Sequence, residues 1–269
     1  MSAADGALFE LAGRVVVVTG ASSGIGWASA WALASRGAIV VPAARRVERL
    51  ERLAEHITDR GGEALPIACD VSDRGSIDAM RDRVLERYGR CDALVNNAGI
   101  PGGGPFTELS DERIEQVVRT NYLGVIWGTR AFLPTMLEQR RGHVVNVASL
   151  AGRYAIPFSA VYSSTKHAVV AFSESLNYET APQGVLVTSV NPGLVSTELF
   201  PHRDTAEGGG LRARLVMPPE RIAATIVRVL ERGIAPEISV PRWLASFQAF
   251  RVVTPPLFRA GVRRAVAAG

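Results

Sequence analysis

The stretch VVVVTGASSGIG, residues 15–26, decides the fold of this chain. Its four valines form an apolar run of strand length, and the glycines that follow mark a turn. From Ile25 to Ser35 the alanine, leucine and tryptophan spacing fits a helix, which Gly37 would end. The stretch therefore predicts a strand, a glycine-rich turn and a helix. Such a turn lets a pyrophosphate approach the backbone at the helix N-terminus, although it can also serve packing alone.

The same alternation of short apolar runs and helical patterns continues to about residue 240. Because parallel neighbouring strands need crossover helices, this order predicts an α/β fold, a doubly wound seven-stranded parallel sheet of the Rossmann type. We expect a single domain over residues 10–241 and a short helical C-terminal extension over residues 242–269. The expected strands are residues 15–18, 38–43, 64–68, 93–95, 142–148, 185–190 and 237–240, and the expected helices are residues 25–35, 47–60, 76–88, 110–137, 161–181 and 219–232.

The end of the second expected strand indicates which nicotinamide cofactor would bind. Ala44 lies 18 residues beyond Gly26, where dinucleotide folds place the residue that contacts the adenosine ribose. NAD-binding sites usually carry Asp or Glu there, whereas this chain has alanine followed by Arg45 and Arg46. A guanidinium suits a phosphate, so NADP(H) is favoured over NAD(H). The alternative is that both arginines simply begin a solvated helix face.

Tyr162 and Lys166 form a candidate acid/base pair. They stand four residues apart and would share one face of a helix. Tyrosine normally titrates near 10, and we expect the field of the lysine to stabilise the phenolate and so lower the tyrosine pKa. Lys166 is the only lysine among 30 basic residues, which suggests a need for its compact ammonium. Ser149, at the end of the fifth expected strand, would hydrogen-bond and orient a substrate oxygen.

The motifs TGASSGIG (19–26), NNAG (96–99) and YSSTK (162–166), together with Asn121 and Ser149, occur in one order over about residues 10–240. In these features the chain resembles the single-domain short-chain dehydrogenases/reductases, of the NADP-preferring type. The resemblance implies that Asn121 holds a water that links Lys166 to solvent as a proton relay. It also implies a homodimer or homotetramer. One departure is Ser23, where many NADP-preferring members carry a basic residue, so phosphate recognition would depend on Arg45, Arg46 and Ser22.

The resemblance also assigns residues to the cofactor. The glycine turn would hold the pyrophosphate, and an aspartate–valine pair would contact the adenine. The NNAG motif would line the cofactor beside the fourth strand, and the NPGLVST segment would hold the nicotinamide carboxamide. The expected cofactor-binding residues are Gly20, Ser22, Ser23, Gly24, Ile25, Gly26, Arg45, Arg46, Asp70, Val71, Asn97, Ala98, Gly99, Tyr162, Lys166, Pro192, Gly193, Val195 and Thr197.

Composition excludes several other classes of protein. The 269 residues carry 47 % apolar and 21 % charged side chains, which is ordinary globular usage. Two cysteines cannot make a disulfide framework, and no basic and apolar leader begins the chain, so we expect a cytoplasmic protein. His143 and His167 have no acids at metal spacing, so no metal is expected. The net charge of +4 arises in residues 201–269, with 11 basic and 5 acidic side chains, and gives no continuous nucleic-acid-binding surface.

The C-terminal extension combines basic and aromatic residues. Residues 242–269 hold five arginines and no acid. Trp243, Phe247 and Phe250 would share one face of a helix that Pro255 and Pro256 end, and a second short helix would follow. This pattern fits packing on the chain's own domain or on a neighbouring subunit. Its alternative is peripheral contact with an anionic membrane.

The sequence as a whole predicts an NADP(H)-dependent oxidoreductase that interconverts an alcohol and a ketone or aldehyde on an apolar small-molecule substrate. The glycine-bearing loops at residues 101–105 and 196–218 would form the walls of the substrate pocket. One alternative is a non-catalytic nucleotide-sensing protein on the same fold. Another is an extended-type sugar-nucleotide epimerase or dehydratase, whose usual glycine motif and larger C-terminal domain differ from those expected here.

Overall fold

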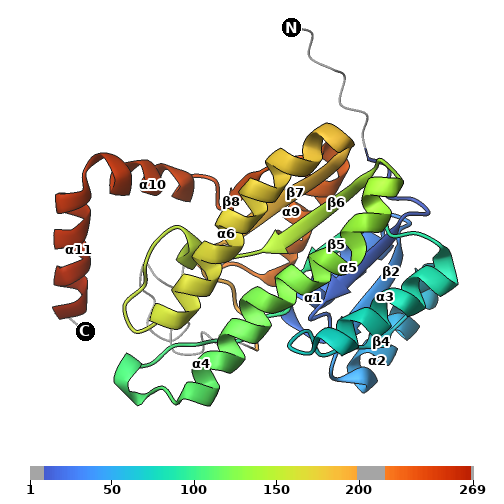
Figure 1. Cartoon of the computed structure of the whole chain (residues 1–269), viewed down its shortest axis with the longest axis horizontal. Coiled ribbons are helices and arrows are strands. Elements are labelled where there is room, and N and C mark those ends of the chain that lie inside the picture. The colour runs from blue at the N-terminus through green and yellow to red at the C-terminus, as the bar shows by residue number, and fades with distance from the viewer. Residues whose placement is uncertain (1–8, 199–215, 268–269) are drawn as a thin grey trace, which may run out of the picture.

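A computed structural model describes residues 9–198 and 216–267 of the chain. Its centre is a parallel sheet in the order β3-β2-β1-β5-β6-β7-β8, with β4 also paired to β2 (Figure 1). The sheet has seven strand positions, as the sequence predicted, and the third is divided between two short segments. The strands are β1 (Val15–Thr19), β2 (Ile39–Ala44), β3 (Glu63–Ala64), β4 (Ile67–Ala68), β5 (Ala93–Asn96), β6 (Gly142–Val147), β7 (Val185–Pro192) and β8 (Glu237–Val240).

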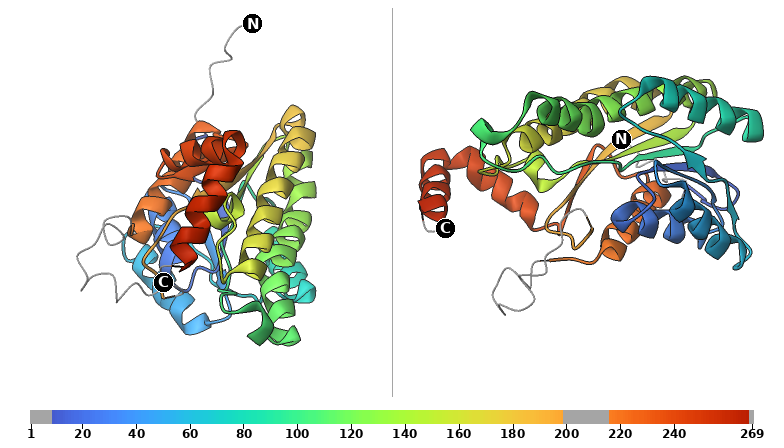
Figure 2. Two further views of the ribbon diagram at one scale, coloured as in Figure 1. Left: turned by 90° about the vertical axis from the view of Figure 1, so that its left-hand side faces the viewer. Right: turned by 90° about the horizontal axis from the view of Figure 1, so that it is seen from below.

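Helices cover both faces of this sheet, so that the chain is doubly wound (Figure 2). On one face α1 packs against α2 and α9, and on the other α3 packs against α5 and α4 against α6. The helices are α1 (Gly24–Ala34), α2 (Val47–Thr58), α3 (Arg74–Tyr88), α4 (Asp111–Val118), α5 (Gly124–Glu138), α6 (Ala160–Thr180), α9 (Pro219–Arg232), α10 (Leu244–Val253) and α11 (Pro255–Ala267).

The four valines of β1 show why a continuous apolar run forms the central strand. Val16 and Val18 belong to the core cluster under α1, α2 and α9, whereas Val15 and Val17 belong to the cluster under α3 and α5. Successive side chains of a strand point to opposite faces, so a strand between two helical layers must be apolar at every position. All four valines are at most 1 % exposed.

Two expected elements are interrupted in the structure. The strand expected at residues 64–68 is split into β3 and β4 around Pro66, which has no N–H to donate to a ladder. The helix expected at residues 110–137 is broken between α4 and α5 by a π-helical segment, Arg119–Leu123. Such wide turns are typical of functional positions, and this one contains Asn121.

The residues after β8 form an arm of two helices, α10 and α11, that extends away from the helical layers (Figures 1 and 2). Tyr154 holds the base of the arm, because its hydroxyl donates to the Leu244 carbonyl at 2.5 Å and its ring stacks on Phe258. The two predicted helices and the break at Pro255 are confirmed. The side chains of Phe247 and Phe250 lie outside the described residues, so the expected aromatic face is not tested.

The 196–218 loop is described only at its ends, because residues 199–215 lie outside the described part. Val195 forms an isolated parallel bridge with Met217, which brings the two ends of this loop together. Within the described residues no helix has the length and apolar character needed to cross a membrane.

Candidate active site

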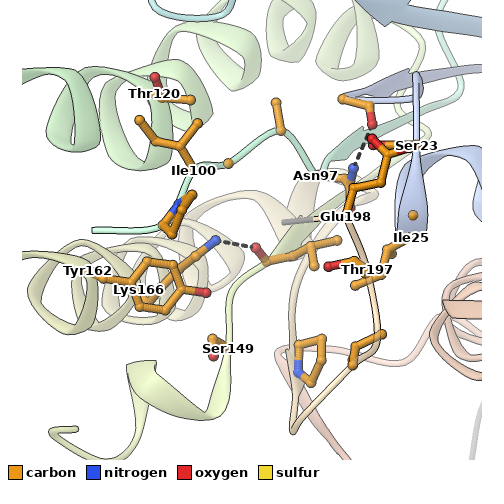
Figure 3. A pocket seen from close by; sticks show the side chains of 18 of the residues that line it. Ser23, Ile25, Asn97, Ile100, Thr120, Ser149, Tyr162, Lys166, Thr197 and Glu198 are labelled. Atoms are coloured by element: carbon orange, nitrogen blue, oxygen red, sulfur yellow. Dashed lines mark hydrogen bonds between the residues drawn. The ribbon is translucent and has the colours of Figure 1, made fainter. Parts of the chain in front are cut away.

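A cavity of about 760 Å³ opens at the carboxyl ends of the strands, where loops after β1, β2, β5, β6 and β7 converge. The neighbours β1 and β5 are the strands between which the order of the sheet reverses. In open α/β sheets ligands bind outside this switch point. The volume of the cavity is typical of a small-molecule site, and Figure 3 shows side chains that line the cavity.

The turn between β1 and α1 requires its glycines for steric reasons. Gly20 and Gly24 have φ of 67° and 54°, in the left-handed region that side chains other than glycine rarely adopt. A Cβ on Gly26 would lie 2.3 Å from the Gly20 carbonyl oxygen. Gly20 and Gly24 line the cavity, whereas Gly26 does not, so Gly26 shapes the turn from behind.

The N-terminus of α1 borders the cavity, and the side chain of its own N-cap residue does not cap it. The N-cap residue Ser23 has extended backbone and makes no side-chain cap hydrogen bond. The first N–H groups of a helix have no partner within the helix and carry partial positive charge. They can therefore receive an anionic group from the cavity, which is the property that a pyrophosphate site needs.

The NNAG segment joins the glycine turn to β5. The Asn97 side chain donates to the Thr19 and Gly20 carbonyl oxygens at 3.0 and 3.3 Å. In return, the Thr19 hydroxyl accepts from the backbone N–H groups of Asn97 and Ala98 at 3.0 and 3.2 Å. These bonds hold the two walls at the switch point together, and a Cβ on Gly20 would already meet Ala98 at 2.7 Å.

Two arginines follow β2 at the end of the cavity beyond the glycine turn. Arg46 is held by the hydroxyls of Ser22 and Ser23 at 3.0 to 3.2 Å. Arg45 is more exposed and lies 3.9 Å from an Asp70 carboxylate oxygen. Ala44 supplies no carboxylate at the end of β2 itself, and the acids that pair with the two arginines, Asp70 and Glu198, come from other segments.

Ser149, Tyr162 and Lys166 lie together at the opposite end of the cavity (Figure 3). Ser149 follows β6, whereas Tyr162 and Lys166 come from the first two turns of α6. Lys166 is buried and its ammonium donates to the Val147 carbonyl at 2.9 Å. Its Nζ lies 5.8 Å from the centre of the Tyr162 ring.

Burial changes the pKa of both members of the candidate pair. It raises the pKa of Tyr162, against which the hydrogen bond with Ser149 acts, and it lowers the pKa of Lys166 to about 8. The sequence analysis expected Lys166 to lower the tyrosine pKa. The structure gives the opposite direction for the tyrosine, because desolvation by burial outweighs the other contributions.

Asn121 is fully buried behind the cavity wall. Its side chain accepts from the Ile100 N–H at 2.7 Å and donates to the Ile100 carbonyl at 2.9 Å. Gly99 lies between Asn121 and Lys166, since a Cβ there would be 3.3 Å from Asn121 Oδ1 and 3.7 Å from Lys166 Nζ. Asn121 therefore fixes the loop after β5 and does not line the cavity.

The structure brings most of the expected site residues together. All line the cavity except Gly26 and Asn121. The sequence analysis did not name several further lining residues individually, because they lie beside the motif residues and carry no reactive pattern of their own. These residues are Ala148, Cys69, Glu198, Ile100, Ile156, Leu194, Ser159, Thr120 and Val147, while Pro101, Gly102 and Gly103 line it from the loop that was expected to do so.

Metal ligands do not gather anywhere in the described residues, where no three His, Cys, Asp or Glu side chains form a group suited to a metal ion. His143 is buried in β6 and its Nε2 lies 2.7 Å from the Thr188 hydroxyl. His167 contacts the Ser163 carbonyl on its own helix. Both histidines have structural partners in the fold.

Comparison with known proteins agrees with this architecture. The short chain dehydrogenase family model matches residues 14–208. An uncharacterised oxidoreductase of Listeria monocytogenes is 37 % identical over 225 residues, which cover 81 % of this chain and 91 % of the relative.

Solved structures include a single-residue variant of the actinorhodin polyketide ketoreductase with NADPH. It is 34 % identical with a TM-score of 0.78 and covers 86 % of this chain and 97 % of its own. A short-chain dehydrogenase/reductase from Burkholderia phymatum in complex with NAD is 31 % identical with a TM-score of 0.81, and covers 93 % of this chain and 96 % of its own.

The fold and these matches define a Rossmann-type oxidoreductase. More particularly, the chain belongs to the short-chain dehydrogenase/reductase family.

Proposed function

We propose that the protein is an NADP(H)-dependent enzyme that interconverts an alcohol and a ketone or aldehyde. One observation carries the proposal. Ser149, Tyr162 and Lys166 share a cavity with the glycine turn and the uncapped N-terminus of α1. A group that can donate a proton and a cradle for a dinucleotide therefore face the same space, as hydride transfer to a carbonyl requires.

The residues of the cavity fit the cofactor. The first turn of α1 can direct its backbone N–H groups at the pyrophosphate, and Gly20 and Gly24 place no side chains in its approach. Pro192, Gly193, Val195 and Thr197 stand on the wall after β7 for the carboxamide end, and Asp70 and Val71 stand beside Arg45 for the adenosine end. The cofactor, when bound, supplies or accepts the hydride.

Tyr162 acts as the proton donor to the substrate oxygen, and Ser149 orients that oxygen by a hydrogen bond. Burial raises the pKa of Tyr162, so its hydroxyl carries the proton at neutral pH that a reduction requires. Lys166 supplies a positive charge on the same helix face and, with its pKa lowered to about 8, can exchange protons near neutrality. Asn121 positions the Ile100 segment beside this group, and we retain its relay role as a proposal.

The preference for NADP(H) depends on the basic wall after β2. Arg46 is already oriented by two serine hydroxyls, and Ala44 places no carboxylate at the end of β2 itself. Similar structures include one with NADPH and one with NAD. For this chain, the arginines after β2 support NADP(H).

The substrate is an apolar small molecule, because Ile100, Ile156 and Leu194 line the same cavity as Tyr162. We further propose that residues 10–241 form the catalytic domain and that the arm of residues 242–269 is an appendage to it. The protein is a cytoplasmic homodimer or homotetramer, and the arm makes contact either with a second copy or, peripherally, with a membrane.

The test is a panel of ketones, aldehydes and the matching alcohols, followed at the nicotinamide absorbance with NADPH and NADH. We expect carbonyl reduction with NADPH. Tight cofactor binding without turnover of any substrate would favour a nucleotide-sensing protein. Turnover that proceeds equally well with both cofactors would contradict the proposed preference.

A further inference from the structure

Glu198 faces Arg46, on which the cofactor proposal depends, and Arg49 on α2, from the opposite wall of the cavity. It follows β7, 152 residues along the chain from Arg46. Its carboxylate accepts from Arg49 Nη1 at 2.6 and 2.9 Å and from Arg46 Nη1 at 3.1 Å. Figure 3 shows Glu198 beside Ser23 and Ile25, at the far end of the pocket from Tyr162.

The donors of Arg46 are shared among three acceptors. Nε and Nη2 donate to the Ser22 hydroxyl at 3.2 and 3.0 Å, and Nη2 also donates to the Ser23 hydroxyl at 3.0 Å. Nη1 donates to Glu198. The two serines therefore fix the plane of the Arg46 guanidinium, and Glu198 accepts from its remaining nitrogen, Nη1.

A carboxylate and a phosphate bind the same donors of a guanidinium, since both accept charge-assisted hydrogen bonds from its N–H groups. A 2′-phosphate that binds Arg46 and Arg49 must displace Glu198 or share the arginines with it. Two anions on one pair of arginines repel each other. An unphosphorylated ribose, by contrast, brings no charge and can donate its 2′-hydroxyl to a carboxylate.

We propose that Glu198 is a cofactor-specificity residue that competes with the 2′-phosphate of NADP(H) for Arg46 and Arg49. The inference rests on the proposed use of a nicotinamide cofactor. The acid that NAD-binding sites place at the end of β2 is here supplied by the segment after β7, so that it weakens the NADP(H) preference that the arginines create. Hydrogen bonds from Arg49, followed by those from Arg46, lower the pKa of Glu198, which keeps the competitor ionised at neutral pH.

The test compares Glu198→Gln with Glu51→Gln, a matched loss of one exposed acid on α2 that has no described contact with the arginines. Dissociation constants for NADPH and NADH are measured by nucleotide fluorescence on the full-length protein. We expect Glu198→Gln to tighten NADPH roughly three- to tenfold, as loss of one exposed charged competitor would. NADH should be unchanged or bind more weakly, and Glu51→Gln should alter neither.

Arg49 provides an independent check. If Glu198 occupies Arg49, the Arg49→Ala substitution should weaken NADPH more strongly in the Glu198→Gln background than in the wild type. An unchanged ratio of the NADPH and NADH constants in Glu198→Gln overturns the competition. A wild type that binds neither nucleotide would instead contradict the proposed function, so the two failures are distinct.

Discussion

Tyr162 and Lys166 show how one physical effect acts on both members of an acid/base pair. Burial favours the neutral form of each, which raises the pKa of the tyrosine and lowers that of the lysine to about 8. The four-residue spacing in the sequence was enough to predict that the two share a helix face. It could not predict the direction of the tyrosine shift, because that depends on how deeply the rest of the fold buries Tyr162.

Replacement of Tyr162 by phenylalanine tests the proton donor. We expect turnover to fall roughly 10²- to 10⁴-fold because only the transferable proton is lost, while NADPH binding remains close to that of the wild type. The measurements are kcat on an active carbonyl and the dissociation constant for NADPH. Tyr178→Phe is the control, since Tyr178 is 65 % exposed and bonded to Glu174 on the surface. Full turnover in Tyr162→Phe would disprove the mechanism.

Arg46 and Arg45 differ in how well they are prepared for a phosphate. Arg46 is fixed by two serines, whereas Arg45 has one long contact to Asp70 at 3.9 Å. We expect Arg46→Ala to weaken NADPH by about tenfold, equivalent to roughly 1.4 kcal/mol, and Arg45→Ala to do so to a smaller extent. Neither should affect NADH greatly. Equal NADPH and NADH constants in the wild type would remove the basis for this ranking.

At the scale of elements, the sequence predicts what local pattern controls and misses what distant contacts control. The strands of β1, β5 and β7 are readable because a strand buried on both faces needs an apolar run. The split of the third strand and the π-helical turn at Asn121 were not predicted. The first could have been inferred from Pro66, whereas the second depends on the Ile100 segment that Asn121 bonds.

His143 couples β6 to β7 in a pH-dependent way. It is 1 % exposed, and burial lowers its pKa to about 3. Thr188 donates to the Ile234 carbonyl and so accepts from His143 Nε2, which assigns the neutral Nε2–H tautomer. The unfolded chain binds a proton near pH 6.5 and the folded chain does not. This group therefore destabilises the fold as the pH falls from about 6.5 towards 3.

We expect the free energy of unfolding to fall by roughly 1.4 kcal/mol between about pH 7.5 and 5.5 through this histidine. The measurement is urea unfolding at both pH values. His143→Gln should reduce that difference, whatever its effect on stability at the higher pH. His56→Gln, on the exposed face of α2, should keep the wild-type difference. Equal pH dependence in wild type and His143→Gln would show that another group is responsible.

At the scale of the whole molecule, the parts of the site that escaped prediction are those joined across the fold. Glu198 meets Arg46 and Arg49 only because the segment after β7 returns to the end of β2. No spacing in the sequence links these residues. The motif residues, in contrast, each follow directly from a strand or lie on the first turns of a helix, so their convergence at one sheet edge could be predicted.

The arm of α10 and α11 combines exposed apolar side chains with arginines. Val252, Val253 and Leu257 are 65 to 77 % exposed on it. Arg251, Arg259 and Arg263 surround a small cavity beside Phe258 and Ala155. Within the described chain none of these arginines forms an ion pair. If the arms of two copies met face to face, arginines would lie against arginines. An anionic bilayer would instead attract the arginines and take up the apolar side chains.

The last prediction is that the full-length protein sediments with vesicles that contain phosphatidylserine, is released by salt and does not bind vesicles of phosphatidylcholine alone. The double substitution Arg259→Glu and Arg263→Glu should abolish this binding, because it reverses two charges of the arm. The control is Arg83→Glu with Arg87→Glu, an exposed pair of equal spacing on α3. If the arm meets a second copy instead, the Arg259→Glu and Arg263→Glu substitutions should change the mass measured by light scattering, and neither the wild type nor the variants should bind vesicles.

Removal of residues 242–269 extends the test to the substrate. If the arm closes the pocket, its loss should raise KM for large apolar carbonyls. A truncated protein with unchanged mass, vesicle binding and KM would show that the arm is dispensable for all three.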